Sequence, residues 1–254
     1  MWADSTAALV DLDLSGRTRI LDVGCGTGEL TRLLATESDA EVIGCDADLD
    51  LLKIANNHCT VGAGDALRLP FVDDSFDLVV CQALLVNLPD PADALREFAR
   101  VSSDLVAAIE PNNAEVSVDS TVEREIELDA CVREAYLRGV ETDVALGDRV
   151  ETLFETSGID VVSVRRYSHE KRTDPPYSDL ALEDAARKAS GAGLADQHAE
   201  LKRGLTGDES TYDDIRAAWR EMGRAIIKQM QTNDYERIES VPFDVTAGRV
   251  RGQR

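Results

Sequence analysis

Short apolar runs alternate with amphipathic stretches along the first half of the chain. Runs typical of buried strands occupy residues 18–25, 41–46, 59–65, 76–82 and 105–111. Between the first two runs, residues 27–38 carry Leu30, Leu33 and Leu34 at helical spacing. Asp48 and the pair Asp90-Pro91 stand where two further helices are expected to begin. Strands that alternate with helices predict right-handed βαβ units around a parallel sheet.

The second half of the chain departs from this rhythm. Residues 114–140 and 146–157 are predicted to be helical, and 160–168 and 241–250 to form the last two strands. A helical insertion is expected between these strands. Its clearest helix places five large apolar residues on one stripe: Tyr212, Ile215, Trp219, Met222 and Ile226. Together the patterns predict an α/β protein with a doubly wound, mostly parallel seven-stranded sheet and one domain over residues 1–254.

The charge is strongly negative. The formal net charge is −22, with 49 acidic and 27 basic residues, and the acids are scattered through every segment. Such a surface is typical of adaptation to a high-salt cytoplasm, where the Debye length falls to about 3 Å at 1 M salt. We therefore predict a halophilic protein.

The sequence also bears on location and redox state. No apolar stretch approaches the roughly 18 residues of a membrane span, and the N-terminus has Asp4 and no basic residue before its apolar patch. A cytoplasmic protein without membrane attachment is expected. The five cysteines have no CxxC spacing, so we expect buried, reduced thiols and neither disulfides nor a metal site: Cys25, Cys45, Cys59, Cys81 and Cys131.

The stretch "LDVGCGTGEL" (21–30) is the first candidate for chemistry. It follows a predicted strand and opens a helix, which is the context in which a glycine motif carries information. A dinucleotide site requires GxGxxG, but the glycines here run GxGxG. Glu29 and Thr31 occupy the positions where either register needs a third glycine. The spacing disfavours a dinucleotide.

Charge points in the same direction. Asp22, Asp46 and Asp65 each lie at the end of one of the first three predicted strands. A pyrophosphate at a helix N-terminus prefers neutral or basic surroundings. S-adenosylmethionine has no phosphate, and its sulfonium and ammonium groups are positive. The acids therefore favour S-adenosylmethionine over a dinucleotide.

These residues resemble the class I S-adenosylmethionine-dependent methyltransferases, especially the small-molecule branch related to quinone-precursor methylases. "LDVGCGTG" is similar to the first motif of that family, and "GDALRLPFVDDSFDLVVC" (64–81) to its third-strand and fourth-strand block. "LLVNLPDPADALREFARV" (84–101) is similar to the segment that follows. The usual lysine-proline-glycine-glycine turn is replaced by "SSD" (102–104). The resemblance covers residues 17–111 and implies a Rossmann-like methyltransferase fold.

The resemblance also implies the cofactor-binding residues. Asp22 and the glycine loop would hold the methionine part, Asp46 both ribose hydroxyls, and Asp65 the adenine amino group. The alternatives are a helix-turn cap for Asp46 and an ordinary loop acid for Asp65. The full set implied is Asp22, Gly24, Cys25, Gly26, Gly28, Asp46, Ala47, Asp65, Ala66 and Gln82.

The acceptor side is less clearly marked. Glu110 opens "EPNN" at a strand end, where the acceptor is expected to lie. The alternative is that these residues form a simple turn. Tyr167 and His169, at the end of the sixth strand, are candidates for a base or a hydrogen-bond donor, although a lone histidine is more often structural. The basic cluster 165–172 could hold an acidic substrate, while Arg165 is expected to face solvent from an edge strand.

The resemblance implies methyl transfer from S-adenosylmethionine to a small-molecule acceptor, with residues 17–111 as the cofactor-binding half. The helical elements in 112–168 and 178–232 are expected on the acceptor side. Methyl transfer needs a general base only if the acceptor must first lose a proton. The alternative is a cofactor-binding, catalytically silent partner or regulatory subunit. No nucleic-acid partner is expected, and the insertion could mediate a homodimer.

Overall fold

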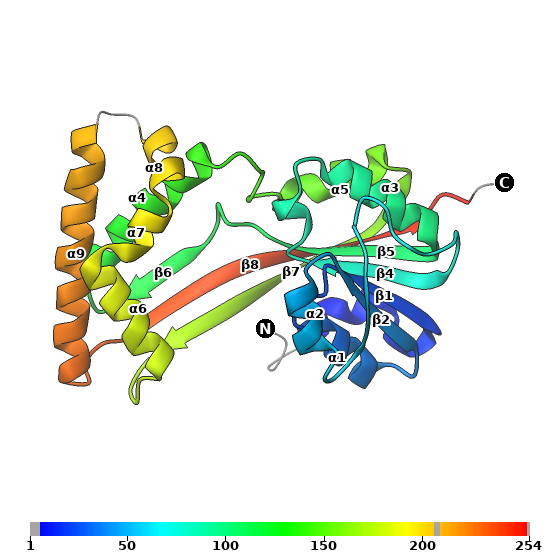
Figure 1. The fold of residues 1–254 in the computed structure, drawn as a ribbon, viewed down its shortest axis with the longest axis horizontal. Helices are drawn as coiled ribbons and strands as arrows, with labels where there is room; N and C mark the ends of the chain where they lie inside the picture. The colour runs from blue at the N-terminus through cyan, green and yellow to red at the C-terminus, as the bar shows by residue number, and fades with distance from the viewer. Residues whose placement is uncertain (1–5, 206–208, 253–254) are drawn as a thin grey trace. The chain divides into compact units, whose positions relative to one another are not determined.

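The computed structural model describes residues 6–205 and 209–252. The chain divides into two compact units (Figure 1). Unit 1 comprises Met1–Asn112, Leu146–Tyr167 and Phe243–Arg254, and unit 2 comprises Asn113–Ala145 and Ser168–Pro242. The single domain expected from the sequence stays a prediction.

Unit 1 contains the parallel sheet. Its strands are β1 (Arg19–Val23), β2 (Glu41–Asp46), β3 (Thr60–Ala63), β4 (Phe76–Gln82) and β5 (Ser102–Pro111). Neighbouring strands follow the order β3-β2-β1-β4-β5 and are parallel. The helices of unit 1 are α1 (Glu29–Glu37), α2 (Leu49–Ala55), α3 (Pro91–Val101) and α5 (Val150–Thr156), with four 3₁₀ helices, η1 (Ala7–Leu12), η2 (Leu14–Gly16), η3 (Leu85–Asn87) and η4 (Gly147–Arg149).

The strand order reverses at β1. This strand pairs with β2 on one side and with β4 on the other, so Asp22 lies opposite both Gly44 and Val80. Because all these strands are parallel, their carboxyl ends meet at one edge of the sheet. In open α/β sheets, ligands bind outside the carboxyl ends at such a reversal. The fold therefore directs attention to the loops that follow β1 and β4.

Two predicted helix starts are confirmed. The Asp48 carboxylate accepts hydrogen bonds from the amides of Asp50 and Leu51 at the start of α2. The Asp90 carboxylate accepts one from the Ala92 amide, with Pro91 as the first residue of α3. Both acids satisfy amides that have no partner within the helix.

Unit 2 is mostly helical. It contains β6 (Ser117–Ser120), α4 (Glu123–Gly139), α6 (Asp179–Ser190), α7 (Ala192–Asp196), α8 (His198–Gly204) and α9 (Glu209–Gln231). Two long strands, β7 (Ile159–Thr173) and β8 (Arg237–Val250), contribute residues to both units. The predicted apolar stripe is confirmed on α9, where Tyr212, Trp219, Met222 and Ile226 are buried and Ile215 is partly buried.

The fold class is confirmed as a mixed, mostly parallel α/β sheet, but among the described residues the sheet has eight strands where seven were predicted. The additional strand is β6, within the range predicted as helix (114–140). It pairs antiparallel with β8, from Ser117 opposite Ser240 to Ser120 opposite Arg237. β8 also pairs antiparallel with β5 and lies next to β7. The residues of β6 were predicted as helix because their local pattern runs on into the helix that follows. Pairing with the distant β8 makes them a strand.

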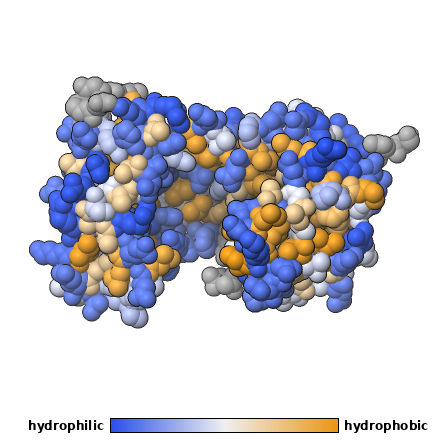
Figure 2. Space-filling view, in the orientation of Figure 1, coloured by the Kyte–Doolittle hydropathy of each residue, from blue (hydrophilic) through white to orange (hydrophobic). Residues whose placement is uncertain are grey.

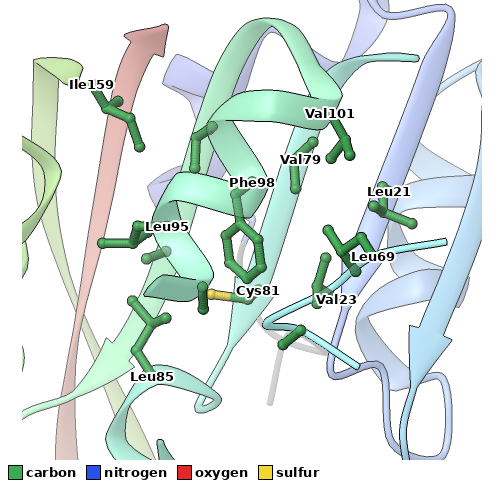
Figure 3. Packing of buried hydrophobic residues seen from close by; sticks show 14 of the residues in the cluster. Leu21, Val23, Leu69, Val79, Cys81, Leu85, Leu95, Phe98, Val101 and Ile159 are labelled. Carbon is green, nitrogen blue, oxygen red and sulfur yellow. The ribbon is translucent and has the colours of Figure 1, made fainter. Parts of the chain in front are cut away.

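One hydrophobic core of unit 1 lies between the sheet and α3. Phe98, on α3, is fully buried and lies among side chains of β1, β4 and the loop before β4 (Figure 3). Cys81 is also buried there, as expected for a small apolar residue. The prediction of burial was wrong for Cys131, which is exposed on α4, and Cys59 is only partly buried. All five cysteines are free thiols.

The hydrophilic surface agrees with the net charge of −22 (Figure 2). Hydrophilic residues cover most of the face of each unit that Figure 2 shows, with scattered apolar residues between them. Within residues 6–205 and 209–252, no helix combines the length and the apolarity needed to cross a membrane.

We expect Phe98→Ala to destabilise the protein by about 3–5 kcal/mol, because it leaves a cavity in a fully buried site. Urea unfolding followed by circular dichroism measures this free energy. Val72→Ala is the matched control, because Val72 is 79% exposed and its change should stay within about 0.5 kcal/mol. Equal losses in the two variants would contradict the assignment of this core.

Candidate functional site

The loop between β1 and α1 is held in an unusual backbone conformation. Gly24, Gly26 and Gly28 have φ angles of +71°, +53° and +79°, in the left-handed region that side chains disfavour. The amides of Gly24 and Cys25 both donate to the Cys45 carbonyl, at 2.7 and 3.1 Å. The loop is therefore fastened to the end of β2.

The three glycines differ in their surroundings. A Cβ at Gly24 would lie 2.9 Å from Leu84 Cδ1, and one at Gly28 would lie 3.1 Å from Cys59 Sγ. At Gly26, no atom lies within 4 Å of that position. Gly24 and Gly28 thus allow close packing, whereas Gly26 leaves the loop backbone open to a ligand.

Asp46 joins the end of β2 to the glycine loop. Its Oδ2 accepts a hydrogen bond from the Gly26 amide at 2.8 Å, and its Oδ1 accepts one from the Asp48 amide at 2.8 Å. The alternative role of Asp46 as a helix-turn cap therefore accounts for only one of its two carboxylate oxygens. The Gly26 amide, which a phosphate would need, is already used.

Asp22 lies behind the loop and is only 1% exposed. Its Oδ2 accepts a hydrogen bond from the Thr31 hydroxyl at 2.6 Å. Burial raises the pKa of Asp22 to about 7, the Thr31 hydrogen bond opposes this rise, and the nearby Asp46 carboxylate adds to it. The role of Thr31 as the partner of Asp22 was not predicted from the sequence. The available signal was a hydroxyl residue placed beside the buried Leu30 and Leu34.

Asp65 and its neighbour follow β3. Asp65 is exposed, and its Oδ1 accepts a hydrogen bond from the Leu67 amide at 2.9 Å. Ala66 is buried beside it, and Ala47, after β2, is exposed. A contact of Asp65 with a ligand stays a prediction, because its hydrogen bond to Leu67 also suits an ordinary loop acid.

The strand β4 ends at Gln82, which is half-buried and lies opposite Ile109 of β5. The next residue, Ala83, has a φ of +50°. Its amide donates to the Ile109 carbonyl at 2.9 Å, and the short helix η3 then begins at Leu85. This turn lies beside the reversal in strand order, on the side of β4.

Glu110 is completely buried at the end of β5. Its Oε1 accepts hydrogen bonds from the amides of Leu84 and Leu85, at 3.1 and 3.0 Å, and its Oε2 accepts one from the Val86 amide at 3.2 Å. Burial raises the pKa of Glu110 to about 7, against the effect of these three amides. Both oxygens are engaged within the fold, so the geometry lends no support to a role as catalytic base.

The other two acceptor-side candidates lie on β7. Tyr167 and His169 are two residues apart, so both side chains leave the same face of the strand, and both are half-buried. They fall in different units, Tyr167 in unit 1 and His169 in unit 2. Their catalytic roles stay predictions.

Much of the basic cluster is used inside the fold. Arg166 forms a bidentate pair with the buried Asp244, at 2.7 and 2.9 Å. Arg165 is exposed on β7, as expected, and also pairs with Asp11 of η1. The long β7 brings Arg165 within reach of an N-terminal acid that is distant in sequence. Among the described residues, no group of three His, Cys, Asp or Glu side chains could hold a metal ion.

Comparisons with known proteins agree with this geometry. Residues 21–104 match the family model described as a methyltransferase domain. This stretch runs from β1 through the glycine loop to the start of β5. The match and the fold identify it as a class I S-adenosylmethionine-dependent methyltransferase domain.

Two relatives each match about two fifths of the chain. A demethylmenaquinone methyltransferase of Lactiplantibacillus plantarum is 40% identical over 111 residues, which are 39% of this chain and 46% of that protein. One of Corynebacterium kroppenstedtii is 44% identical over 103 residues, 40% of this chain and 43% of that protein. The chain thus spans about half the length of these relatives.

Solved structures extend the likeness in fold to nearly the whole chain. The YcgJ protein of Bacillus subtilis has a TM-score of 0.56 at 17% identity, covering 96% of this chain and 97% of that one. A candidate methyltransferase of Bacillus halodurans also has a TM-score of 0.56, at 18% identity, covering 97% and 98%. At such identities the likeness concerns the fold alone.

The buried Asp22 predicts an unusual pH dependence of stability. Its folded pKa of about 7 lies above the ordinary 3.8, so the folded state holds this proton more tightly than the unfolded state does. The resulting stabilisation is full below pH 3.8 and is lost as the pH rises to about 7. At pH 8 the ionised carboxylate then costs about 4 kcal/mol, by order of magnitude.

We therefore expect Asp22→Asn to raise the melting temperature of the ligand-free protein at pH 8, and to raise it less at pH 5. The amide oxygen can still accept the Thr31 hydrogen bond. Differential scanning calorimetry at the two pH values checks this, with Thr31→Val as the control for loss of the hydrogen bond alone. A melting-temperature difference that is the same at both pH values would contradict the raised pKa.

Proposed function

We propose that this protein binds S-adenosylmethionine at the carboxyl ends of β1, β2 and β4 and transfers its methyl group to a small-molecule acceptor. One observation carries the proposal. The glycine loop is held by the Asp46 carboxylate, with the buried Asp22 carboxyl behind it. Two acids at a ligand-binding edge attract a positively charged ligand.

The same arrangement argues against a dinucleotide. A pyrophosphate needs free amides and a favourable charge at the start of a helix. Here the Gly26 amide donates to Asp46, and Glu29 occupies the first turn of α1. S-adenosylmethionine carries no phosphate, so it needs no free Gly26 amide, and its positive groups are compatible with the acidic Glu29.

The residues at this edge would divide the binding. Asp22 and the backbone from Gly24 to Gly28 would face the methionine part, Asp46 the ribose, and Asp65 the adenine. The bound cofactor supplies a methyl group already activated by its sulfonium. The protein then has only to hold the acceptor in line with that methyl, and such positioning can lower a barrier by about 7–11 kcal/mol.

The acceptor is proposed to be a small organic molecule. The relatives named as demethylmenaquinone methyltransferases make a quinone precursor the first compound to test. The residues 21–104 that match the family model lie within unit 1, and all of unit 2 lies beyond them. We propose that the helical elements of unit 2 select the acceptor.

The second candidate is a cofactor-binding partner subunit without its own turnover. The engagement of Glu110 within the fold favours it, because that residue was the acid expected nearest to the acceptor. Incubation with methyl-labelled S-adenosylmethionine and a metabolite extract distinguishes the two. The enzyme transfers label to a small molecule and forms S-adenosylhomocysteine, whereas the silent subunit binds the cofactor and forms neither product.

The proposal also covers the location, the partners and the oligomeric state of the protein. We propose a cytoplasmic location, no nucleic-acid partner, and a homodimer through the insertion at residues 178–232. Light scattering in solution measures the mass directly. A monomer at all concentrations would remove the homodimer without affecting the proposed activity.

We expect Asp46→Ala to weaken binding of S-adenosylhomocysteine, the demethylated cofactor, by about 2–4 kcal/mol. The change removes bonds to the ribose and leaves the Gly26 amide without its partner. Isothermal titration calorimetry gives the dissociation constant, and circular dichroism checks the fold.

Asp48→Ala is the matched control, two residues away. It removes the cap of α2 and should lower stability by about 0.5–2 kcal/mol without changing affinity. An unchanged dissociation constant in folded Asp46→Ala would exclude Asp46 from the site.

A further inference from the structure

Two loops flank the reversal in strand order: the glycine loop after β1 and the loop after β4. The two loops are in contact. Leu84, in the loop after β4, packs directly on Gly24 of the glycine loop. A Cβ at Gly24 would lie 2.9 Å from Leu84 Cδ1 and 3.1 Å from its Cδ2. The position of Leu84 therefore sets one boundary of the glycine loop.

The loop after β4 needs help to adopt its shape. Ala83 is in the left-handed region, with a φ of +50°. The amides of Leu84, Leu85 and Val86 stand at the start of η3, where no preceding helical turn supplies acceptors. Leu85 and Val86 are buried, so water is a poor substitute.

Glu110 supplies the acceptors for all three amides from the neighbouring strand. Its two oxygens lie 3.0–3.2 Å from these nitrogens. Burial of a carboxylate is costly, and hydrogen bonds from several amides offset that cost. An apolar residue here would leave three amides without acceptors, which explains an acid at a completely buried position.

We propose that Glu110 is a positioning residue of the cofactor site. Its carboxylate holds the segment Leu84–Val86, and through Leu84 it holds the glycine loop in the arrangement that binds the cofactor. The inference rests on the proposed function. Glu110 itself touches no ligand and acts through the loop after β4.

The conservative change Glu110→Gln tests this role. A glutamine has one acceptor oxygen. If that oxygen keeps the amides of Leu84 and Leu85, its NH₂ group faces the Val86 amide, and two donors then oppose each other. We expect the Val86 amide to exchange its hydrogen faster than in the wild type, with smaller changes at Leu84 and Leu85. The dissociation constant for S-adenosylhomocysteine should rise about tenfold, the size of one lost hydrogen bond to a charged group.

The experiment combines amide hydrogen exchange, followed by nuclear magnetic resonance, with calorimetric titration of S-adenosylhomocysteine. The matched control is Thr246→Val, a change of similar size on β8. Thr246 is completely buried, and its hydroxyl has no hydrogen-bond partner among the residues that the structure describes. This control should leave both the exchange of residues 84–86 and the affinity unchanged.

The outcomes separate a positioning role from a merely structural one. Faster exchange confined to residues 84–86, together with weaker binding, supports the inference. Unchanged affinity in Glu110→Gln overturns it, as does faster exchange throughout β1 to β5 or an equal loss of affinity in Thr246→Val. A wild-type protein that does not bind S-adenosylhomocysteine would remove the proposed function and this inference together, whereas unchanged affinity in the variant alone leaves the function standing.

Discussion

The hydrogen bond from the Gly26 amide to the Asp46 carboxylate is the contact on which the site depends. A loop with three glycines in the left-handed region has many alternative conformations, and selecting one costs conformational entropy. The bonds to Asp46 and to the Cys45 carbonyl select it by joining the loop to the end of β2. The parallel pairing of β1 with β2 brings these partners together.

The site concentrates acids where their charge is costly. Asp22 and Glu110 are buried, and burial raises the pKa of each to about 7. Two such groups lower the stability of the ligand-free fold at neutral pH. For Glu110, hydrogen bonds from three amides of the loop after β4 offset part of this cost. For Asp22, which is proposed to face a cationic group of the ligand, the carboxylate becomes favourable when the ligand binds, so stability lost in the ligand-free fold is exchanged for affinity.

Much of unit 1 could be predicted from the sequence because its information is local. The strands β1 to β5 are apolar runs, and Asp48 and Asp90 cap helices within three residues of themselves. β6 was missed because it depends on pairing with β8, more than a hundred residues later.

The site residues follow the same division. The glycine spacing and Asp46 could be recognised within one motif. The role of Glu110 could not, because its three donors belong to the loop after another strand. Thr31 was missed for a similar reason, since its partner Asp22 precedes the glycine loop. Adaptation to high salt stays a prediction that rests on the net charge of −22.

The central claim is that a ligand with a positively charged ammonium group binds against the carboxyl pair of Asp22 and Asp46. Calorimetric titration of S-adenosylhomocysteine near pH 7, repeated in buffers of different ionisation enthalpy, counts the protons exchanged on binding. The ammonium of the ligand should lower the pKa of Asp22, so binding to the wild type should release a fraction of a proton, and binding to Asp22→Asn should release less. Binding without proton release, or equal release in the two proteins, would contradict the account.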